Sequence, residues 1–166
     1  MRVFILHVDP VPKGRPRFNQ KTKKIYTPDR TKTFQDEVRK QVCLSLGQYF
    51  DYPMFDKDVP VCVDVDFVFK RTQALNKKRY DDGLMWKNTG EDKDNLEKAV
   101  FDALNGILWE DDRQIVDGRT RKLWGRKNKA SMICLAVRTA GEPPYTTCNN
   151  WGASGLEPMT LETEDE

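Results

Sequence analysis

The sequence predicts a single small domain of the α/β class. Its 166 residues suit one domain built around one hydrophobic core. Short apolar runs, one of them alternating in part, are typical of β-strands. Two longer segments repeat apolar residues every three or four positions, as amphipathic helices do. Strands and helices are therefore both expected, and each is justified below in chain order.

The first third of the chain predicts a strand, a non-helical segment and a helix. Residues 2–8 form an apolar run with β-branched members, typical of a strand. The prolines of residues 10–16 exclude a helix there, and residues 21–28 indicate a hairpin-like excursion or turn. A helix from about residue 33 to 50, capped by Thr31 or Thr33, is expected because apolar side chains recur at helical spacing: Phe34, Val38, Val42 and Leu46.

The central part predicts a strand, a loop and the clearest helix of the chain. Alternation within residues 59–69 places the odd-numbered side chains from Val61 to Phe69 on one face of a strand. The polar segment 71–91 is expected to be a long, mobile loop. A helix from Asp94 to Ile107 follows from one apolar stripe, with Asn105-Gly106 as its stop: Leu96, Val100, Ala103, Leu104 and Ile107.

The last third predicts two strands and a tail. Residues 114–123 and 131–138 are expected to be the final strands. Residues 141–166 contain no Lys or Arg, six acids, and several helix- and strand-breaking residues. We therefore expect a folded domain at residues 1–140 and an acidic, flexible tail at 141–166.

The charge distribution favours a polyanionic partner. Residues 1–140 hold all 28 basic residues but only 20 of the 26 acidic ones. No segment is apolar enough to span a bilayer, and the N-terminus lacks the ordered regions of a signal peptide, so a cytoplasmic protein with no membrane partner is expected. One histidine and four cysteines without a CxxC pair argue against a zinc site.

Acidic residues near the start of the 94–107 helix suggest a metal site. Asp92 and Asp94 are two positions apart, so in an extended segment their carboxylates point the same way, and Lys98 follows one helical turn later. If the chain returns after the helix, Asp111 and Asp112 could approach them. Oxygen ligands of this kind suit Mg²⁺, with Mn²⁺ as a substitute, and such ions serve phosphoryl chemistry. The alternative is structural: Asp94 as a helix N-cap, Asp92 solvated, and Asp111-Asp112 in a turn.

The run from Asp92 to Val116 closely resembles the signature of RusA-like Holliday junction resolvases. That signature reads D-x-D-N-L-x-K, then a helix with D-A-L, then W-x-D-D-x-Q-V/I, and the early Pro-Lys-Gly-Arg-Pro-Arg segment at 12–17 supports it. The resemblance implies a mixed β-sheet packed with helices in a homodimer that binds four-way DNA junctions and makes paired, symmetric nicks with Mg²⁺. It also implies metal-binding aspartates at Asp92, Asp94 and Asp112 and a catalytic lysine at Lys98. Glu91 departs from the family, because some members carry a basic residue there.

Two basic stretches are candidates for contacts with the DNA backbone. The predicted DNA-binding residues are Lys13, Arg15, Arg17, Lys93, Arg121 and Lys122. Four aromatic residues among the basic ones could wedge or stack at a junction centre: Phe18, Tyr26, Tyr80 and Trp86. Two alternatives stay open, namely a less selective nuclease on branched DNA and a non-catalytic nucleic-acid-binding dimer.

Overall fold

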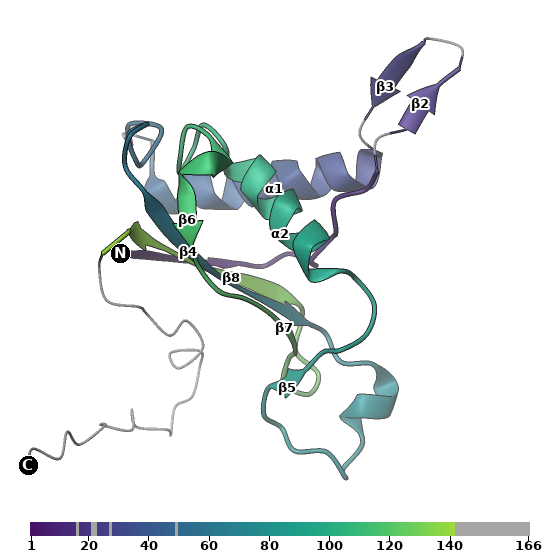
Figure 1. Cartoon of the computed structure of the whole chain (residues 1–166). Helices are drawn as coiled ribbons and strands as arrows, with labels where there is room; N and C mark the ends of the chain where they lie inside the picture. The colour runs from purple at the N-terminus through teal and green to yellow at the C-terminus, as the bar shows by residue number, and fades with distance from the viewer. Residues whose placement is uncertain (16, 21–22, 27, 49, 142–166) are drawn as a thin grey trace, which may run out of the picture.

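The protein is a mixed β-sheet with two helices packed on one of its faces (Figure 1). This computed structural model describes residues 1–15, 17–20, 23–26, 28–48 and 50–141. The six-stranded sheet has the order β1 (Arg2–Leu6), β8 (Met132–Thr139), β4 (Val61–Phe69), β7 (Thr120–Trp124) and β5 (Met85–Trp86), with β6 (Ile115–Asp117) also beside β4. The predicted small α/β domain with a mixed sheet is confirmed.

Strand β4 is the centre of the hydrophobic core. It runs antiparallel to β8 and parallel to both β6 and β7. The alternating side chains predicted to share one face are all buried, and they pack in the core with the helices. The opposite face of β4 is buried as well, since Cys62, Asp66 and Val68 are at most 4% exposed.

The two helices are α1 (Asp29–Leu46) and α2 (Lys93–Leu104). Helix α1 begins four residues earlier than expected, directly after Pro28, whose fixed φ of −56° suits the entrance to a helix. The predicted caps are wrong: Pro28 occupies the N-cap position without a side-chain hydrogen bond. Thr31 instead lies buried inside the first turn, where its hydroxyl accepts a hydrogen bond of 3.1 Å from the Gly14 N–H.

The strand predicted at 114–123 is divided into β6 and β7. Both run parallel to β4, which requires the crossover that α2 provides. The break falls at Gly118, where a Cβ atom would lie 1.9 Å from the carbonyl oxygen of Val63. The next residue is held by a 2.8 Å hydrogen bond from the Arg119 N–H to the Asp64 carboxylate. The close backbone approach therefore excludes a side chain at the position where the strand is interrupted.

Three smaller features complete the fold. Strands β2 (Arg17–Asn19) and β3 (Lys24–Tyr26) form the expected hairpin, which projects from the body (Figure 1). Segment 71–91 is not the structureless loop predicted, because it contains the 3-10 helix η1 (Gln73–Asn76) and strand β5. The predicted tail lies outside the described residues from 142 onward. In the part of the chain that the structure describes, no helix is both long and apolar enough to cross a membrane.

Candidate active site

The start of α2 presents two exposed carboxylates. Asp92 occupies the N-cap position with an extended backbone, and Asp94 lies in the first turn. The Asp92 carboxylate makes no capping hydrogen bond to the helix and accepts only a long one, 3.4 Å, from the Asn95 side chain. Asp94 is not the N-cap, so that part of the structural alternative is wrong, whereas Asp92 is exposed as that alternative expected. The positive end of the helix dipole stabilises both negative charges at this end of α2.

Lys98 lies beside Asp94, as the four-residue spacing predicts. Its Nζ atom is 3.4 Å from Oδ2 of Asp94, and the two side chains are 59% and 61% exposed. An exposed pair of this kind contributes only about 0.3–0.5 kcal/mol to a helix. The fold therefore does not depend on this acid and base, and both are accessible to a ligand in solution.

Glu91, the residue that departs from the family signature, is an internal partner of Lys87. The Lys87 Nζ lies 3.1 Å from the Glu91 carboxylate and 4.7 Å from the ring centroids of both Phe69 and Trp124. Burial by itself raises the pKa of Glu91, but a hydrogen bond from its own backbone and the charge of Lys87 outweigh burial and lower that pKa. The Glu91 carbonyl also accepts a 2.6 Å hydrogen bond from the Lys122 Nζ, which ties the entrance of α2 to β7.

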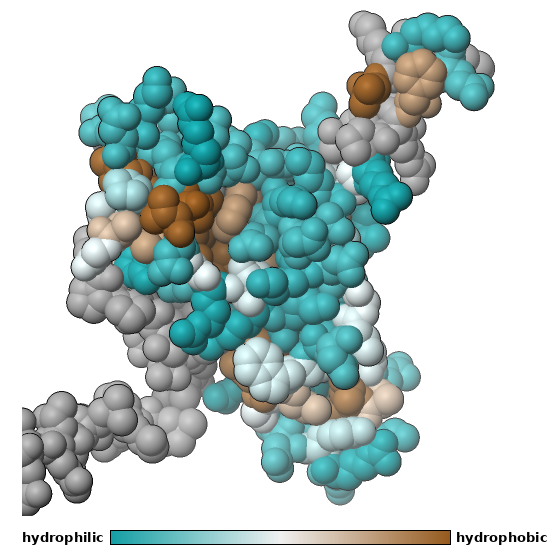
Figure 2. Space-filling model, in the orientation of Figure 1, coloured by the Kyte–Doolittle hydropathy of each residue, from teal (hydrophilic) through white to brown (hydrophobic). Residues whose placement is uncertain are grey.

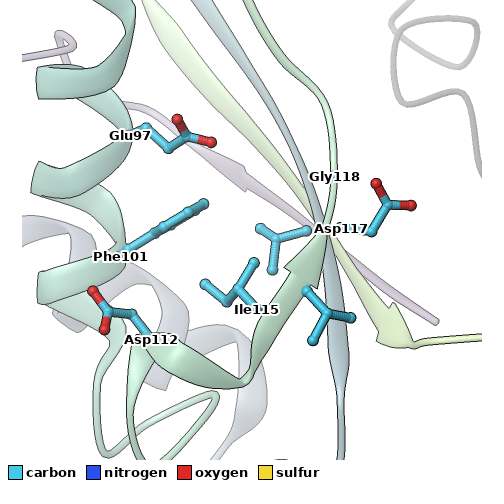
Figure 3. Close-up of a pocket in the computed structure, with 8 residues that line it drawn as sticks. Glu97, Phe101, Asp112, Ile115, Asp117 and Gly118 are labelled. Carbon is cyan, nitrogen blue, oxygen red and sulfur yellow. The ribbon is translucent and has the colours of Figure 1, made fainter.

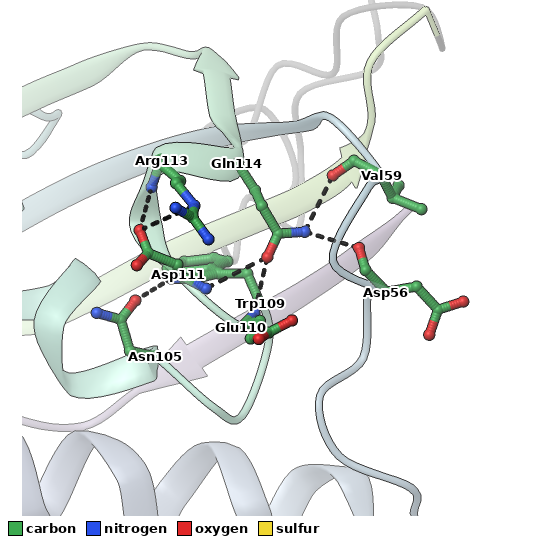
Figure 4. A network of polar contacts seen from close by, with 8 residues as sticks. All are labelled: Asp56, Val59, Asn105, Trp109, Glu110, Asp111, Arg113 and Gln114. Carbon is green, nitrogen blue, oxygen red and sulfur yellow. Dashed lines mark hydrogen bonds and ion pairs between the residues drawn. The ribbon is translucent and has the colours of Figure 1, made fainter.

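The second acidic pair lies at the short 3-10 helix η2 (Asp112–Gln114). Asp111 caps it by accepting a 3.0 Å hydrogen bond from the Arg113 N–H. The buried Gln114 side chain accepts from the N–H groups of Glu110 and Asp111 and donates to the carbonyls of residues 56 and 59 (Figure 4). These bonds fix the backbone that carries Asp111 and Asp112.

A hollow of about 290 Å³ separates α2 from β6. Its lining residues are Val63, Glu97, Phe101, Asp112, Ile115, Val116, Asp117 and Gly118. Glu97 and Asp112 flank it from the helix side, whereas Asp117 points away (Figure 3). Apolar side chains gather on the surface over β6 beside it (Figure 2). The hollow is therefore partly apolar, with two carboxylates at its margin.

The carboxyl group of Asp112 has a raised pKa. Burial is the largest cause, followed by the negative charges of Asp111 and Asp102, while the charge of Lys13 acts in the opposite direction. Lys13 itself forms a 2.5 Å ion pair with Asp102. Asp112 therefore belongs to a group of charges at the second half of α2.

The two acidic pairs do not meet within one chain. Asp112 lines the hollow with Glu97 and Phe101 of α2, which come three and seven residues after Asp94. Among the described residues, no three His, Cys, Asp or Glu side chains are grouped to hold a metal ion. The structure therefore does not bring Asp92, Asp94 and Asp112 together as a metal site in a single chain. The chain reverses after α2, and η2 returns beside Glu97 and Phe101.

The predicted DNA-binding residues divide into internal and exposed ones. Arg121 forms two hydrogen bonds, 2.5 and 2.8 Å, with the carboxylate of Asp66, which is 1% exposed. Lys122 donates to the Glu91 carbonyl, and Lys13 pairs with Asp102. These three cations are paired within the chain. The acceptor of Arg121 is buried, whereas the side chains of Lys13 and Asp102 are 38% and 29% exposed. The exposed candidates are Arg15 and Lys93, and the side chain of Arg17 lies outside the described part.

Three residues of the site escaped the sequence-based reasoning: Glu97, Asp102 and Gln114. Glu97 lines the hollow and accepts a 2.8 Å hydrogen bond from the Thr120 hydroxyl, a contact between α2 and β7 that local sequence does not indicate. Asp102 is the aspartate of the D-A-L segment of the signature, which could have marked it, but its influence on Asp112 depends on the return of the chain. Gln114 is part of the W-x-D-D-x-Q signature, which could have marked it.

Comparison with known proteins agrees with the signature. The family model for endodeoxyribonuclease RusA matches residues 7–133, which is most of the chain. A protein of Bacillus subtilis (strain 168), described as uncharacterized protein YqaN, is 27% identical over 137 residues, covering 81% of this chain and 95% of that protein. The matched region includes both helices, both acidic pairs and Lys98. The chain therefore belongs to the RusA endodeoxyribonuclease family.

Proposed function

We propose that this protein is an Mg²⁺-dependent endodeoxyribonuclease that resolves four-way DNA junctions by paired, symmetric nicks. Family membership supports nuclease activity on branched DNA. The observation that carries the proposal is the solvent-exposed group of Asp92, Asp94 and Lys98, which the fold does not use for its own stability. A lysine beside such carboxylates can neutralise the charge that grows on a phosphate during hydrolysis. The proposed place of action is the cytoplasm of a bacterial or phage-infected cell.

The metal is the part of the proposal that one chain does not satisfy. Carboxylate oxygens are the ligands that Mg²⁺ and Mn²⁺ prefer, so the chemistry of the donors fits. Their positions do not form a site of three acids among the described residues of one chain. We propose that the protein acts as a C2 homodimer, in which η2 of one copy lies beside the α2 start of the other. A dimer also presents two equivalent sites to a junction with approximate two-fold symmetry.

Cleavage of a synthetic four-way junction tests the activity. The wild-type protein should make paired nicks in the junction with Mg²⁺, and should leave a linear duplex of the same sequence intact. Asp94→Asn should abolish cleavage while binding persists or tightens, because one negative charge facing the phosphates is removed. The control is Asp58→Asn, which changes an exposed aspartate in a turn outside the site. Equal cutting of both DNAs by the wild type would indicate a less selective nuclease, and binding without cutting a non-catalytic protein.

Mixing two inactive variants tests the shared site. In a heterodimer of the Asp94→Asn and Asp112→Asn variants, one of the two sites keeps all its aspartates if each site combines residues of both subunits. If each site lies within one chain, neither site keeps all of them. We therefore expect subunit exchange to restore nicking of one strand per junction, and no restored activity after verified exchange would refute the shared arrangement.

A further inference from the structure

Residues 71–86 and 125–129 form one ordered lobe at the β5 edge of the sheet, here named the edge lobe (Figure 1). Arg71 is 3% exposed and holds it together from inside. Its guanidinium donates to the carbonyls of Gly125 at 2.5 Å, Asp81 at 2.8 Å and Leu75 at 3.3 Å, and also to that of Gly83. An arginine bonded to four backbone carbonyls makes a rigid centre for an otherwise polar segment.

Two further hydrogen bonds join the two parts of the edge lobe. The Asp82 carboxylate accepts a 2.7 Å hydrogen bond from the Lys127 N–H, and the Asn76 side chain accepts one of 3.4 Å from the Asn128 N–H. The segment before β5 and the turn between β7 and β8 therefore behave as a single surface, although about 50 residues separate them in the sequence.

The edge lobe is strongly basic. It contains seven Lys and Arg residues against only two acids, Asp81 and Asp82. One acid, Asp82, already accepts a backbone hydrogen bond. The exposed cations are Lys77, Lys78, Arg79, Arg126 and Lys129. A surface of this charge attracts phosphates whatever the base sequence.

Trp86 adds a large aromatic ring to this basic surface. Its side chain is 73% exposed, and the neighbouring Leu84 is 41% exposed. The backbone beneath the ring is nevertheless fixed: Trp86 pairs with Leu123 in the sheet, and the Lys87 N–H donates to the Lys122 carbonyl at 3.0 Å. The ring is therefore presented to solvent from a rigid strand, which keeps the entropy cost of binding through it small.

The edge lobe is mechanically linked to the start of α2. The backbone carbonyl of Lys122 holds Lys87, next to Trp86, while its side chain holds the carbonyl of Glu91, next to Asp92. The Lys87–Glu91 ion pair also joins the end of β5 to the residue before Asp92. A strand bound to the edge lobe is thus held in a fixed relation to the exposed carboxylates.

We propose that the edge lobe is a DNA-binding surface on which an unstacked base at the branch point stacks against Trp86 while the exposed cations hold the adjacent phosphates. This inference rests on the proposed function for its substrate. An exposed aromatic ring on a lobe rich in exposed cations fits single-stranded or opened nucleic acid, because every base offers a π-face and every nucleotide a phosphate. A continuous duplex keeps its base faces covered, so the ring distinguishes branched from linear DNA.

Binding measured without metal tests the inference. Trp86→Ala should weaken the affinity of the full-length protein for a synthetic four-way junction about tenfold, in keeping with the loss of one base–aromatic stack. Affinity for a linear duplex should change less than about twofold by the same reasoning. Trp86→Phe, which keeps a ring, should retain most of the affinity. The matched control is Leu44→Ala, on α1, whose side chain is equally exposed at 73%.

The charges are tested separately through the salt dependence. The double variant Lys77→Gln/Lys78→Gln should reduce the slope of log affinity against log salt by about two, equally for junction and duplex. Thermal unfolding of each variant verifies that the fold is intact.

The outcomes separate this inference from the proposed function. If Trp86→Ala binds the junction as tightly as the wild type, or dissociates a dimer while the DNA affinity of the monomer is unchanged, the inference is overturned. If the wild type never cuts a junction but binds it through Trp86, the inference stands and the proposed nuclease function fails. If the wild type cuts junctions and the charge and ring variants bind normally, only the inference fails.

Discussion

Replacing Gln114 by glutamate isolates the hydrogen bonds that hold the second acidic pair. Gln114 is 7% exposed, and its Nε2 donates to the carbonyls of Asp56 at 2.7 Å and Val59 at 3.1 Å. Its Oε1 accepts from the N–H groups of Glu110 and Asp111 at 2.8 and 3.3 Å. Gln114→Glu keeps the shape and both acceptor interactions but removes both donors, so that a carboxylate faces two buried carbonyl oxygens.

The size of the effect follows from those two lost donors. The two carbonyls are partly buried, so each one left without its donor costs about 1–2 kcal/mol, and the variant should lose roughly 2–4 kcal/mol of the free energy of unfolding. For a protein of this size each 1 kcal/mol lowers Tm by about 2–4 °C, which gives a decrease of roughly 4–16 °C. Junction cleavage should fall as well, because the backbone carrying Asp112 loses its connection to residues 56–59.

The loss should depend on pH in a definite direction. Burial beside two carbonyls raises the pKa of the introduced carboxyl above its unfolded value of about 4.3. Below about pH 4.3 the acid is protonated and can donate to one carbonyl, so the variant loses less free energy of unfolding relative to the wild type. This loss grows as pH rises through the pKa that the carboxyl has in the folded state. Thermal unfolding at pH 5 and pH 8 measures this difference.

The matched control is Gln73→Glu, at the exposed start of η1, where the same chemical change should alter Tm by less than about 2 °C. The reasoning is refuted if Gln114→Glu melts within about 1 °C of the wild type at pH 8, which would show that the two hydrogen bonds donated by Gln114 do not restrain the turn.

Other substitutions test the remaining interactions. Arg121→Ala should cost about 3–5 kcal/mol in chemical unfolding because it leaves the Asp66 carboxylate buried and without its arginine; a cost below about 1 kcal/mol would contradict the internal role. Asp102→Asn should lower the pKa of Asp112, because a neighbouring negative charge is removed, and NMR titration measures this change. Since the raised pKa of Asp112 makes the protein less stable as pH rises through that pKa, the variant should lose less stability over this range than the wild type. Gly118→Ala should reduce Tm sharply or give insoluble protein, since the added Cβ would lie 1.9 Å from a carbonyl oxygen; a wild-type melting curve would disprove the close approach.

Much of the fold follows from local sequence patterns. The alternation around Val61–Phe69 predicted β4, and the apolar stripe of residues 96–104 predicted α2. The helix ends at Leu104, three residues before the predicted end at Ile107. The four-residue spacing of Asp94 and Lys98 correctly predicted that their side chains meet, because one helical turn brings residues i and i+4 together. A shared site of Asp92 with these two residues stays a prediction. The family followed from the signature in residues 92–116.

Tertiary structure alone decided which charged residues are available for function. Arg121 looked like a surface cation, but Asp66, 55 positions earlier, engages it inside the sheet. Gln114 finds its acceptors 55 to 58 residues away, and Asp112 returns to a hollow that Glu97 and Phe101 of α2 also line. Local periodicity determines which face of a strand or helix is buried. The partner of a polar side chain depends on which distant segments the packed sheet and helices bring beside it.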